Sequence, residues 1–134
     1  MQTDTARGRI AIIDDDAIFV ELMRDLLADG EGYEVVSAPN WLHSVEFVKE
    51  SRPDLIILDL MLGRDQTGWG VLELLRAEPG FAEVPVIMCS AAEPALRKCA
   101  GIGAVEAVAK PFDVEHLLDV VERMLTESRA TALV

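Results

Sequence analysis

Basic residues are scarce in this sequence compared with acidic ones. Twelve lysines and arginines stand against 24 aspartates and glutamates, which gives a formal net charge of −12. Such a surface repels phosphate backbones and anionic membranes, so direct binding to nucleic acid is not expected. The excess of acidic side chains instead favours cations or basic protein surfaces as partners.

Long apolar runs and cysteines are scarce as well. No run approaches the roughly 18 apolar residues of a spanning helix, and residues 1–9 lack the apolar stretch of a signal peptide. A cytoplasmic location without membrane insertion is therefore the default expectation. The two cysteines, Cys89 and Cys99, lack the spacing of metal ligands, and we interpret them as small buried hydrophobic residues.

Hydrophobic residues make up 51% of the 134 positions, which is ample for one packed domain. We predict a single domain with a core at residues 9–126, a polar N-terminal arm at 1–8 and a frayed tail at 127–134. Neither an internal repeat nor a second domain is evident in the pattern. We therefore expect a stand-alone domain without an attached output module.

Strand-like and helix-like segments alternate five times along the chain. Short apolar or β-rich runs predict strands at residues 10–14, 33–38, 55–59, 84–90 and 104–109. Helical spacing predicts helices between them, with Asp16, Asn40 and Asp113 as N-terminal caps, a short helix at 95–101 and a last helix after residue 113. Alternation with continuous apolar strands indicates an α/β fold: a doubly wound five-stranded parallel sheet in a three-layer sandwich.

Polar residues stand where four of these strands end. They are Asp14 and Asp15 after the first strand, Asp59 at the third, Ser90 at the fourth and Lys110 at the fifth. In an open parallel sheet, ligands bind beyond the carboxyl ends of the strands. The fold is therefore expected to gather these residues at one edge of the sheet.

Three carboxylates at one edge repel one another. At about 4 Å and an effective dielectric near 20, each pair costs on the order of 4 kcal/mol. Lys110 can offset one charge, and Mg²⁺ can offset two, because it accepts a few carboxylates together with water and phosphate oxygens. A carboxylate can also act as a nucleophile and form an acyl phosphate. The set therefore favours phosphoryl transfer, with Mg²⁺, Lys110 and Ser90 each binding one phosphoryl oxygen.

Four motifs, "IAIIDDDAIF", "PDLIILDLML", "VPVIMCSA" and "VAKPFD", resemble the receiver domain of two-component response regulators. The resemblance covers residues 9–125 and implies a flavodoxin-like (βα)5 fold with strand order 2-1-3-4-5, the order that flavodoxin shares with a chemotaxis receiver. It implies that a histidine kinase or phosphotransfer protein phosphorylates the chain, which then changes conformation and regulates a downstream effector protein. The chain would then be no enzyme beyond its own phosphotransfer and dephosphorylation.

The resemblance also implies a role for each site residue. Asp59 matches the phosphoacceptor, Ser90 and Lys110 match the hydroxyl and lysine residues, and the bond before Pro111 is expected to be cis. The implied Mg²⁺ ligands are Asp14, Asp15, Asp59 and the backbone carbonyl of Met61. We expect a monomer or a weak dimer, with Arg97, Glu106 and Arg123 available to line a charged face.

Several positions depart from the receiver pattern. Gly63 replaces a proline, Gly68 comes one residue late, and Ala107 stands where receivers carry the aromatic residue that moves on activation. An alternative function is therefore an interaction module whose partner binding does not depend on phosphate. If the chain is phosphorylated, residues 61–70 are expected to shift in place of the missing aromatic side chain.

Two other classes fit less well. An aspartate-nucleophile phosphatase needs an acid at the position of Met61, and a flavin-binding module would need a phosphate loop where "DDDAIF" repels phosphate. Asp16 is interpreted as a helix cap, and Trp41 and Trp69 as partly packed surface residues. No catalytic role is expected for His43 or His116.

Overall fold

The computed structural model of the chain describes residues 7–40, 43–60, 67–91 and 97–132. Five strands form one parallel sheet in the order β2-β1-β3-β4-β5. The strands are β1 (Arg9–Ile13), β2 (Glu34–Ala38), β3 (Leu55–Asp59), β4 (Val86–Ser90) and β5 (Val105–Ala109). This sheet confirms the doubly wound α/β fold that alternation predicts and the strand order that the resemblance implies.

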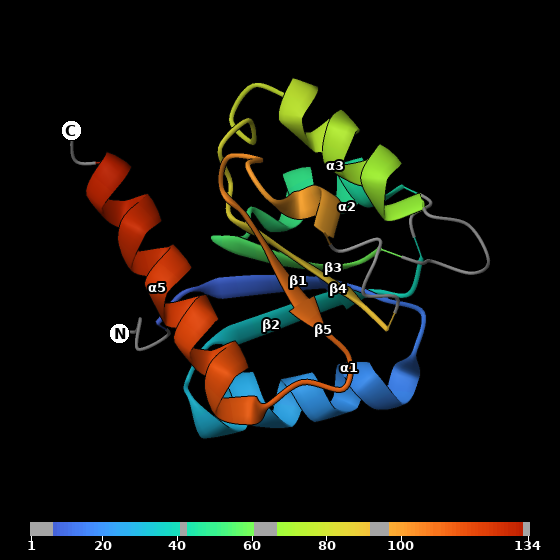
Figure 1. Cartoon of the computed structure of the whole chain (residues 1–134), viewed down its shortest axis with the longest axis vertical. Coiled ribbons are helices and arrows are strands. Elements are labelled where there is room, and N and C mark those ends of the chain that lie inside the picture. Colours follow the sequence, from blue (N-terminus) through green and yellow to red (C-terminus); the bar gives the residue numbers. More distant parts are fainter. Residues whose placement is uncertain (1–6, 41–42, 61–66, 92–96, 133–134) are drawn as a thin grey trace.

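Helices cover both faces of the sheet, so the molecule has three layers (Figure 1). One layer holds α1 (Ala17–Arg24), its π-helical continuation η1 (Asp25–Gly30) and α5 (Val114–Ala132). The other holds α2 (Ser44–Ser51), α3 (Thr67–Ala77) and the 3-10 turn η2 (Arg97–Cys99). None of the helices in the described ranges is both long enough and apolar enough to cross a membrane.

Alternate residues of each strand face opposite layers. In β1, Ile10 and Ile12 pack against the α1 and α5 layer, whereas Ala11 and Ile13 pack against the α2 and α3 layer. Every residue of β3 and β4 is buried. The continuous apolar runs of the sequence therefore reflect a sheet that is covered on both sides, where each buried Ile or Leu side chain contributes about 1.5–3 kcal/mol.

Two of the three predicted helix caps are present. The Asp16 carboxylate accepts hydrogen bonds from the N–H groups of Ile18 and Phe19, and Asp113 accepts one from Glu115 at 2.9 Å. For α2, in contrast, the N-cap residue is His43 and not the predicted Asn40. Helix α2 begins after His43, whose backbone is left-handed with φ of 58° and whose side chain makes no capping hydrogen bond. A backbone turn therefore sets the start of α2, and Trp41 lies outside the described residues.

Helix α5 continues to Ala132, although residues from 127 onward were expected to fray. The Arg129 guanidinium donates a hydrogen bond to the backbone carbonyl of Arg7. Arg7 in turn pairs with Glu122 at 3.0 Å and lies over the Tyr33 ring. These contacts join the N-terminal arm to the middle of α5 at Glu122 and to its end at Arg129, where they support the helix beyond its apolar stripe.

Arg76, in the last turn of α3, closes the edge of the sheet where the strands begin. Its guanidinium donates hydrogen bonds to the carbonyls of Phe81 and Val84, at 3.1 and 2.9 Å, ahead of β4. It also donates to the carbonyls of Gly103 and Ala104, both at 3.3 Å, ahead of β5. One side chain therefore holds two loops together, and burial lowers its pKa.

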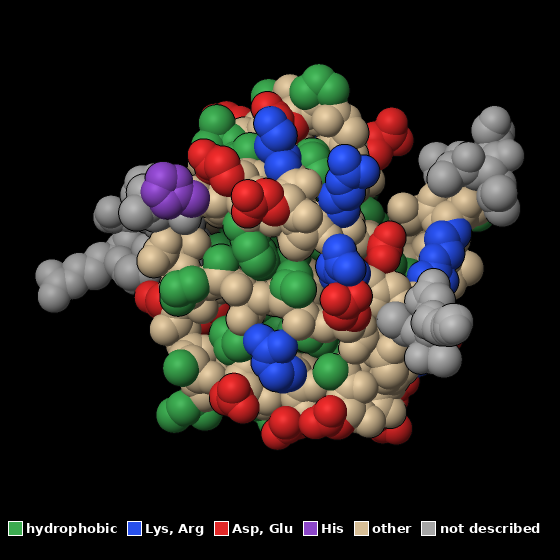
Figure 2. All heavy atoms as spheres, turned by 180° about the vertical axis from the view of Figure 1, so that it is seen from behind, with side chains coloured by type: hydrophobic (Ala, Val, Ile, Leu, Met, Phe, Trp, Pro, Cys, Tyr) green, Lys and Arg blue, Asp and Glu red, His purple; other side chains and the backbone are tan. Residues whose placement is uncertain are grey.

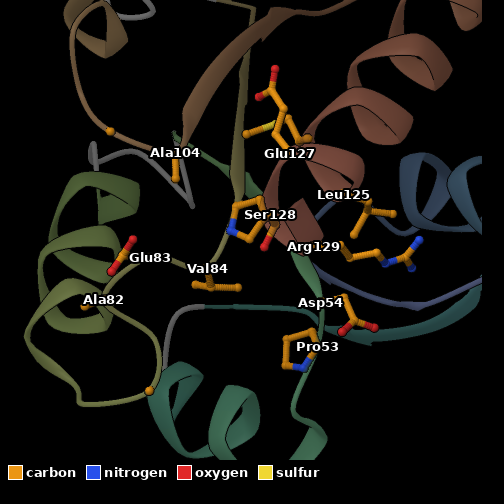
Figure 3. A pocket seen from close by; sticks show the side chains of 14 residues that line it. Pro53, Asp54, Ala82, Glu83, Val84, Ala104, Leu125, Glu127, Ser128 and Arg129 are labelled. Atoms are coloured by element: carbon orange, nitrogen blue, oxygen red, sulfur yellow. The ribbon is translucent and has the colours of Figure 1, made fainter. Parts of the chain in front are cut away.

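A cavity of about 740 Å³ opens beside this contact, against the last turns of α5. Figure 3 shows Asp54, Glu83, Glu127 and Arg129 around it. The cavity lies at the amino-terminal ends of β3, β4 and β5. This edge of the sheet is opposite to the carboxyl edge that carries the predicted site. We therefore do not assign the phosphoryl chemistry to it.

Figure 2 shows acidic and basic side chains interleaved with apolar ones on one face of the molecule.

Candidate functional site

The predicted acidic residues meet at the carboxyl edge of the sheet. Asp14 directly follows β1, Asp59 ends β3, and these neighbouring strands pair in parallel. Asp14 is 2% exposed and Asp59 is 7% exposed, whereas Asp15 is exposed. One carboxylate oxygen from each of the three residues lies within 4.8 Å of the others. Such a set of hard oxygen atoms suits a divalent cation, as the sequence predicts.

Lys110 brings a positive charge to this cluster from the end of β5. Its Nζ lies 2.8 Å from Asp14 Oδ2 and 3.7 Å from Asp59 Oδ2. Burial acts to lower the pKa of Lys110, but the hydrogen bond to Asp14 and the charges of Asp14 and Asp59 outweigh it, so the pKa is raised. The ammonium therefore stays charged and contacts both carboxylates that the sequence places at strand ends.

Backbone hydrogen bonds in the turn after β1 hold the carboxylates of Asp14 and Asp16 in place. The Asp16 N–H donates a hydrogen bond to Asp14 Oδ1 at 2.9 Å. Asp16 itself caps α1, which separates its role from that of Asp14 and Asp15. Asp14 thus has one oxygen held by the backbone and the other bound to Lys110. This arrangement fixes the Asp14 carboxylate before any ligand binds.

Ser90 lies at the same edge, at the end of β4. It is 1% exposed, and its backbone carbonyl accepts a hydrogen bond from the Lys110 N–H at 2.9 Å. This bond continues the parallel ladder in which Ser90 pairs with Ala109. The Lys110–Pro111 peptide bond is cis, as the resemblance implies.

Cys89 forms part of the floor below the acidic residues, since it pairs with Asp59 in the β3–β4 ladder. Complete burial, together with the charges of Asp14 and Asp59, raises the pKa of its thiol to about 12, against the opposing effect of Lys110. The thiol therefore remains protonated at neutral pH and does not act as a nucleophile or metal ligand. Both cysteines are buried and free, as the sequence analysis expects.

Sequence reasoning did not identify two residues that contact the site. Phe19 of α1 places its ring beneath the Lys110 ammonium, with 4.1 Å between Nζ and the ring centroid. Gly68 of α3 packs against the backbone of β3, where a Cβ atom would lie 2.7 Å from the carbonyl oxygen of Asp59. Helical spacing marks Phe19 only as a core residue, and the resemblance marks Gly68 only as the residue that opens the third helix.

Other residues named in the sequence analysis lie outside the described ranges or away from the cluster. Met61 and Gly63, with the segment 61–66, lie outside the described residues. Ala107 is partly buried on the sheet face that α2, α3 and Cys99 cover. Trp69 is partly packed against the same core, as expected, and the Arg123 guanidinium pairs with Glu106 at 3.1 Å on the surface.

Known proteins share this sequence pattern and fold. The family model of the response regulator receiver domain matches residues 10–122. The DNA-binding response regulator MtrA of Mycobacterium tuberculosis is 36% identical over 117 residues, which cover 86% of this chain and 49% of that protein. The DNA-binding dual master transcriptional regulator RpaA of Synechocystis is 36% identical over 119 residues, covering 87% of this chain and 48% of that protein. This chain thus spans about half the length of these curated relatives.

A solved structure supports the same assignment. The signal receiver domain of a signal transduction histidine kinase from Syntrophus aciditrophicus superimposes with a TM-score of 0.77 and 26% identity, covering 90% of this chain and 91% of that one. Family match, relatives and fold agree with the acidic residues and lysine gathered at the carboxyl edge of the sheet. The chain belongs to the response regulator receiver domain family of two-component signal transduction.

Proposed function

We propose that this receiver accepts a phosphoryl group on Asp59 from a phosphohistidine of a histidine kinase or phosphotransfer protein. The position of the Lys110 ammonium carries the proposal, because it lies 2.8 Å from Asp14 and 3.7 Å from Asp59. An ammonium in this place can neutralise charge on a phosphoryl group that becomes attached to Asp59.

The reaction forms one bond and breaks another. A carboxylate oxygen of Asp59 attacks phosphorus, the bond between phosphorus and the histidine nitrogen breaks, and the imidazole keeps that electron pair. The Lys110 ammonium and the Ser90 hydroxyl bind phosphoryl oxygens. Since the chain carries out only its own phosphorylation and the later loss of phosphate, we propose that it is not an enzyme acting on a separate substrate.

Mg²⁺ is the proposed cofactor, with Asp14, Asp15 and Asp59 as its carboxylate ligands and the backbone carbonyl of Met61 as a further ligand implied by the resemblance. The fit rests on the three carboxylate oxygens that lie within 4.8 Å of one another. Bound Mg²⁺ supplies positive charge beside the phosphoryl oxygens and lowers the repulsion among the acidic residues.

An apolar surface beside the site supports a protein as phosphodonor. Ile18 and Leu22, one turn apart on α1, are 83% and 47% exposed, and Val114 at the start of α5 is 39% exposed. Phe19 of α1 packs edge-on against Phe112, which lies two residues before the start of α5. Exposed apolar side chains next to a charged site suit docking of a partner protein that delivers the phosphoryl group.

A downstream effector protein is the proposed target of the phosphorylated form. The curated relatives are DNA-binding regulators of about twice the length. The net charge of −12 on this chain disfavours direct contact with nucleic acid. We therefore propose that the receiver itself acts through protein contacts, as a monomer or a weak dimer.

Phosphorylation of Asp59 is tested by incubating the protein with Mg²⁺ and acetyl phosphate, trapping the adduct with borohydride and mapping it by mass spectrometry. We expect one labelled residue, Asp59, and no label in Asp59→Asn. The matched control is Asp54→Asn, just ahead of β3 at the opposite edge of the sheet and exposed, which should label as the wild type does. If Asp59→Asn takes up as much label as the wild type, Asp59 is not the phosphoacceptor.

Ala107 favours a second candidate, an interaction module whose partner binding does not depend on phosphate. Ala107 has no side-chain rotamer that could move into space left by Ser90, so one usual two-state element is missing. The candidates differ in one measurement. Partner affinity that is the same with and without beryllofluoride and Mg²⁺ supports the second candidate, whereas a change in affinity supports phosphorylation control.

A further inference from the structure

The Lys110 ammonium has an aromatic contact in addition to its carboxylate partners. Its Nζ lies 4.1 Å from the centroid of the Phe19 ring and 2.8 Å from Asp14 Oδ2. The Lys110 side chain is only 19% exposed, and Phe19 is 8% exposed. The negative face of an aromatic ring attracts a cation, and this attraction increases when water is largely excluded.

Phe19 is held firmly by the elements around it. Its N–H donates to the capping carboxylate of Asp16 at 3.2 Å, within the turn that carries the acidic residues. Its ring and the Phe112 ring pack in a T-shaped arrangement, with centroids 5.8 Å apart and an interplanar angle of 86°. Phe112 follows Lys110 by two residues. The ring therefore joins the start of α1 to the segment after β5 at the point where Lys110 enters the site.

We propose that Phe19 is a positioning residue for Lys110 during phosphorylation of Asp59, an inference that rests on the proposed function. In the unphosphorylated form Lys110 donates to Asp14 and lies farther from Asp59, at 3.7 Å. To bind a phosphoryl oxygen on Asp59, the ammonium has to turn away from Asp14. A ring face attracts the cation without accepting a directed hydrogen bond, so it becomes the main support of the ammonium when the hydrogen bond to Asp14 is given up, and its contribution is larger during the transfer than before it.

A purely structural role makes a different prediction. If Phe19 only fills the core, its shape matters and the electron density of its ring does not. If Phe19 holds the ammonium, withdrawing electron density from the ring weakens the contact even when the shape is kept. Fluorination of the ring separates these cases, because fluorine draws charge from the ring face while adding little volume.

The experiment places trifluorophenylalanine at position 19 and measures the rate of Mg²⁺-dependent labelling of Asp59 by acetyl phosphate. Loss of a cation–π contact of ordinary strength corresponds to a rate lower by about two- to thirtyfold. The matched control carries the same residue at position 47. Phe47 of α2 is partly buried in the core on the other face of the sheet, and its fluorination should leave the rate unchanged.

Proton chemical shifts test the contact directly. The ε-methylene protons of Lys110 should be displaced upfield by the Phe19 ring, and Phe19→Leu should return them toward values for free lysine. Phe19→Tyr keeps the ring and should keep both the displacement and most of the labelling rate.

A position-19 fluorinated protein that labels at the wild-type rate overturns the inference. A rate loss that fluorination at position 47 reproduces overturns it as well, because that loss is a general packing effect. Failure of the wild type to label Asp59 at all would instead refute the proposed function, so the two failures are distinguishable.

Discussion

Gly68 and Asp59 are in backbone contact across the start of α3 and the end of β3. A Cβ atom at Gly68 would lie 2.7 Å from the Asp59 carbonyl oxygen and 2.6 Å from the Cα of Leu60. The Gly68 N–H also donates to the Leu60 carbonyl at 3.0 Å. The absence of a side chain at Gly68 therefore allows α3 to approach the backbone that carries Asp59.

We expect Gly68→Ala to destabilise the protein by about 1–3 kcal/mol, because backbone atoms on both sides would have to move. The same movement displaces Asp59 relative to Lys110, so the labelling rate should also fall. Urea unfolding and acetyl phosphate labelling measure the two effects.

Gly70, further along the first turn of α3, is the matched control. Outside its own helix, no atom of the described residues lies within 4 Å of a Cβ placed there, so Gly70→Ala should stabilise the helix by about 0.5–1 kcal/mol and leave labelling unchanged. Equal effects of the two substitutions would show that helix propensity, and not the contact with Asp59, is responsible.

Mg²⁺ is expected to stabilise the protein by relieving repulsion among Asp14, Asp15 and Asp59. Binding to the folded state alone contributes about 2.7 kcal/mol at a hundredfold excess over the dissociation constant. The melting temperature should therefore rise in millimolar Mg²⁺, and Asp15→Ala should abolish most of the rise. Asp119→Ala removes an exposed acidic residue outside the cluster and should keep it. A rise that persists in Asp15→Ala means that the ion binds elsewhere.

The layers and the composition of the acidic cluster could be predicted from the sequence because both follow from simple regularities. Continuous apolar runs predict strands that are covered on both sides, and parallel strands place Asp14, Asp59, Ser90 and Lys110 at one edge. These features depend on the order of strands and helices along the chain, so errors of one or two residues in the predicted bounds of each element do not change them.

Features that depend on approach distances between distant segments could not be predicted in this way. The ring of Phe19 beneath Lys110 and the contact of Gly68 with Asp59 each join two elements, and helical spacing describes only one element at a time. Likewise, α5 extends to Ala132 because Arg129 reaches the carbonyl of Arg7, a contact that no local pattern reveals.

Arg76 provides a test of stability at the opposite edge of the sheet. Its guanidinium donates to four backbone carbonyls, two of them at the longer distance of 3.3 Å. A hydrogen bond to a charged group contributes about 1.5–3 kcal/mol. We expect Arg76→Met to lower the free energy of unfolding by about 2–4 kcal/mol. Arg76→Lys should rescue little, because an ammonium cannot span both loops.

Arg97→Met is the control, since Arg97 is exposed and its replacement should change the free energy of unfolding by less than about 0.5 kcal/mol. Urea unfolding of the three variants gives the comparison. Similar losses in Arg76→Met and Arg97→Met would contradict a specific role for the four carbonyl contacts.

The Cys89 thiol predicts how stability depends on alkaline pH. Its pKa is raised from 9.0 to about 12 in the folded protein, mainly by burial. Above pH 9 the unfolded state loses this proton while the folded state keeps it, so stability is fully present below pH 9 and falls as pH rises toward 12. The loss is about 1.4 kcal/mol per pH unit within that interval.

In EDTA, urea unfolding at pH 8 and pH 10 should therefore show a smaller loss of stability in Cys89→Ala than in the wild type. Val108, which pairs with Cys89 across β4 and β5, supplies a control without a titrating group. Val108→Ala should be less stable at both pH values yet lose as much between them as the wild type does. A loss in Cys89→Ala equal to that of the wild type would mean that the buried thiol ionises as readily in the folded protein as in the unfolded chain.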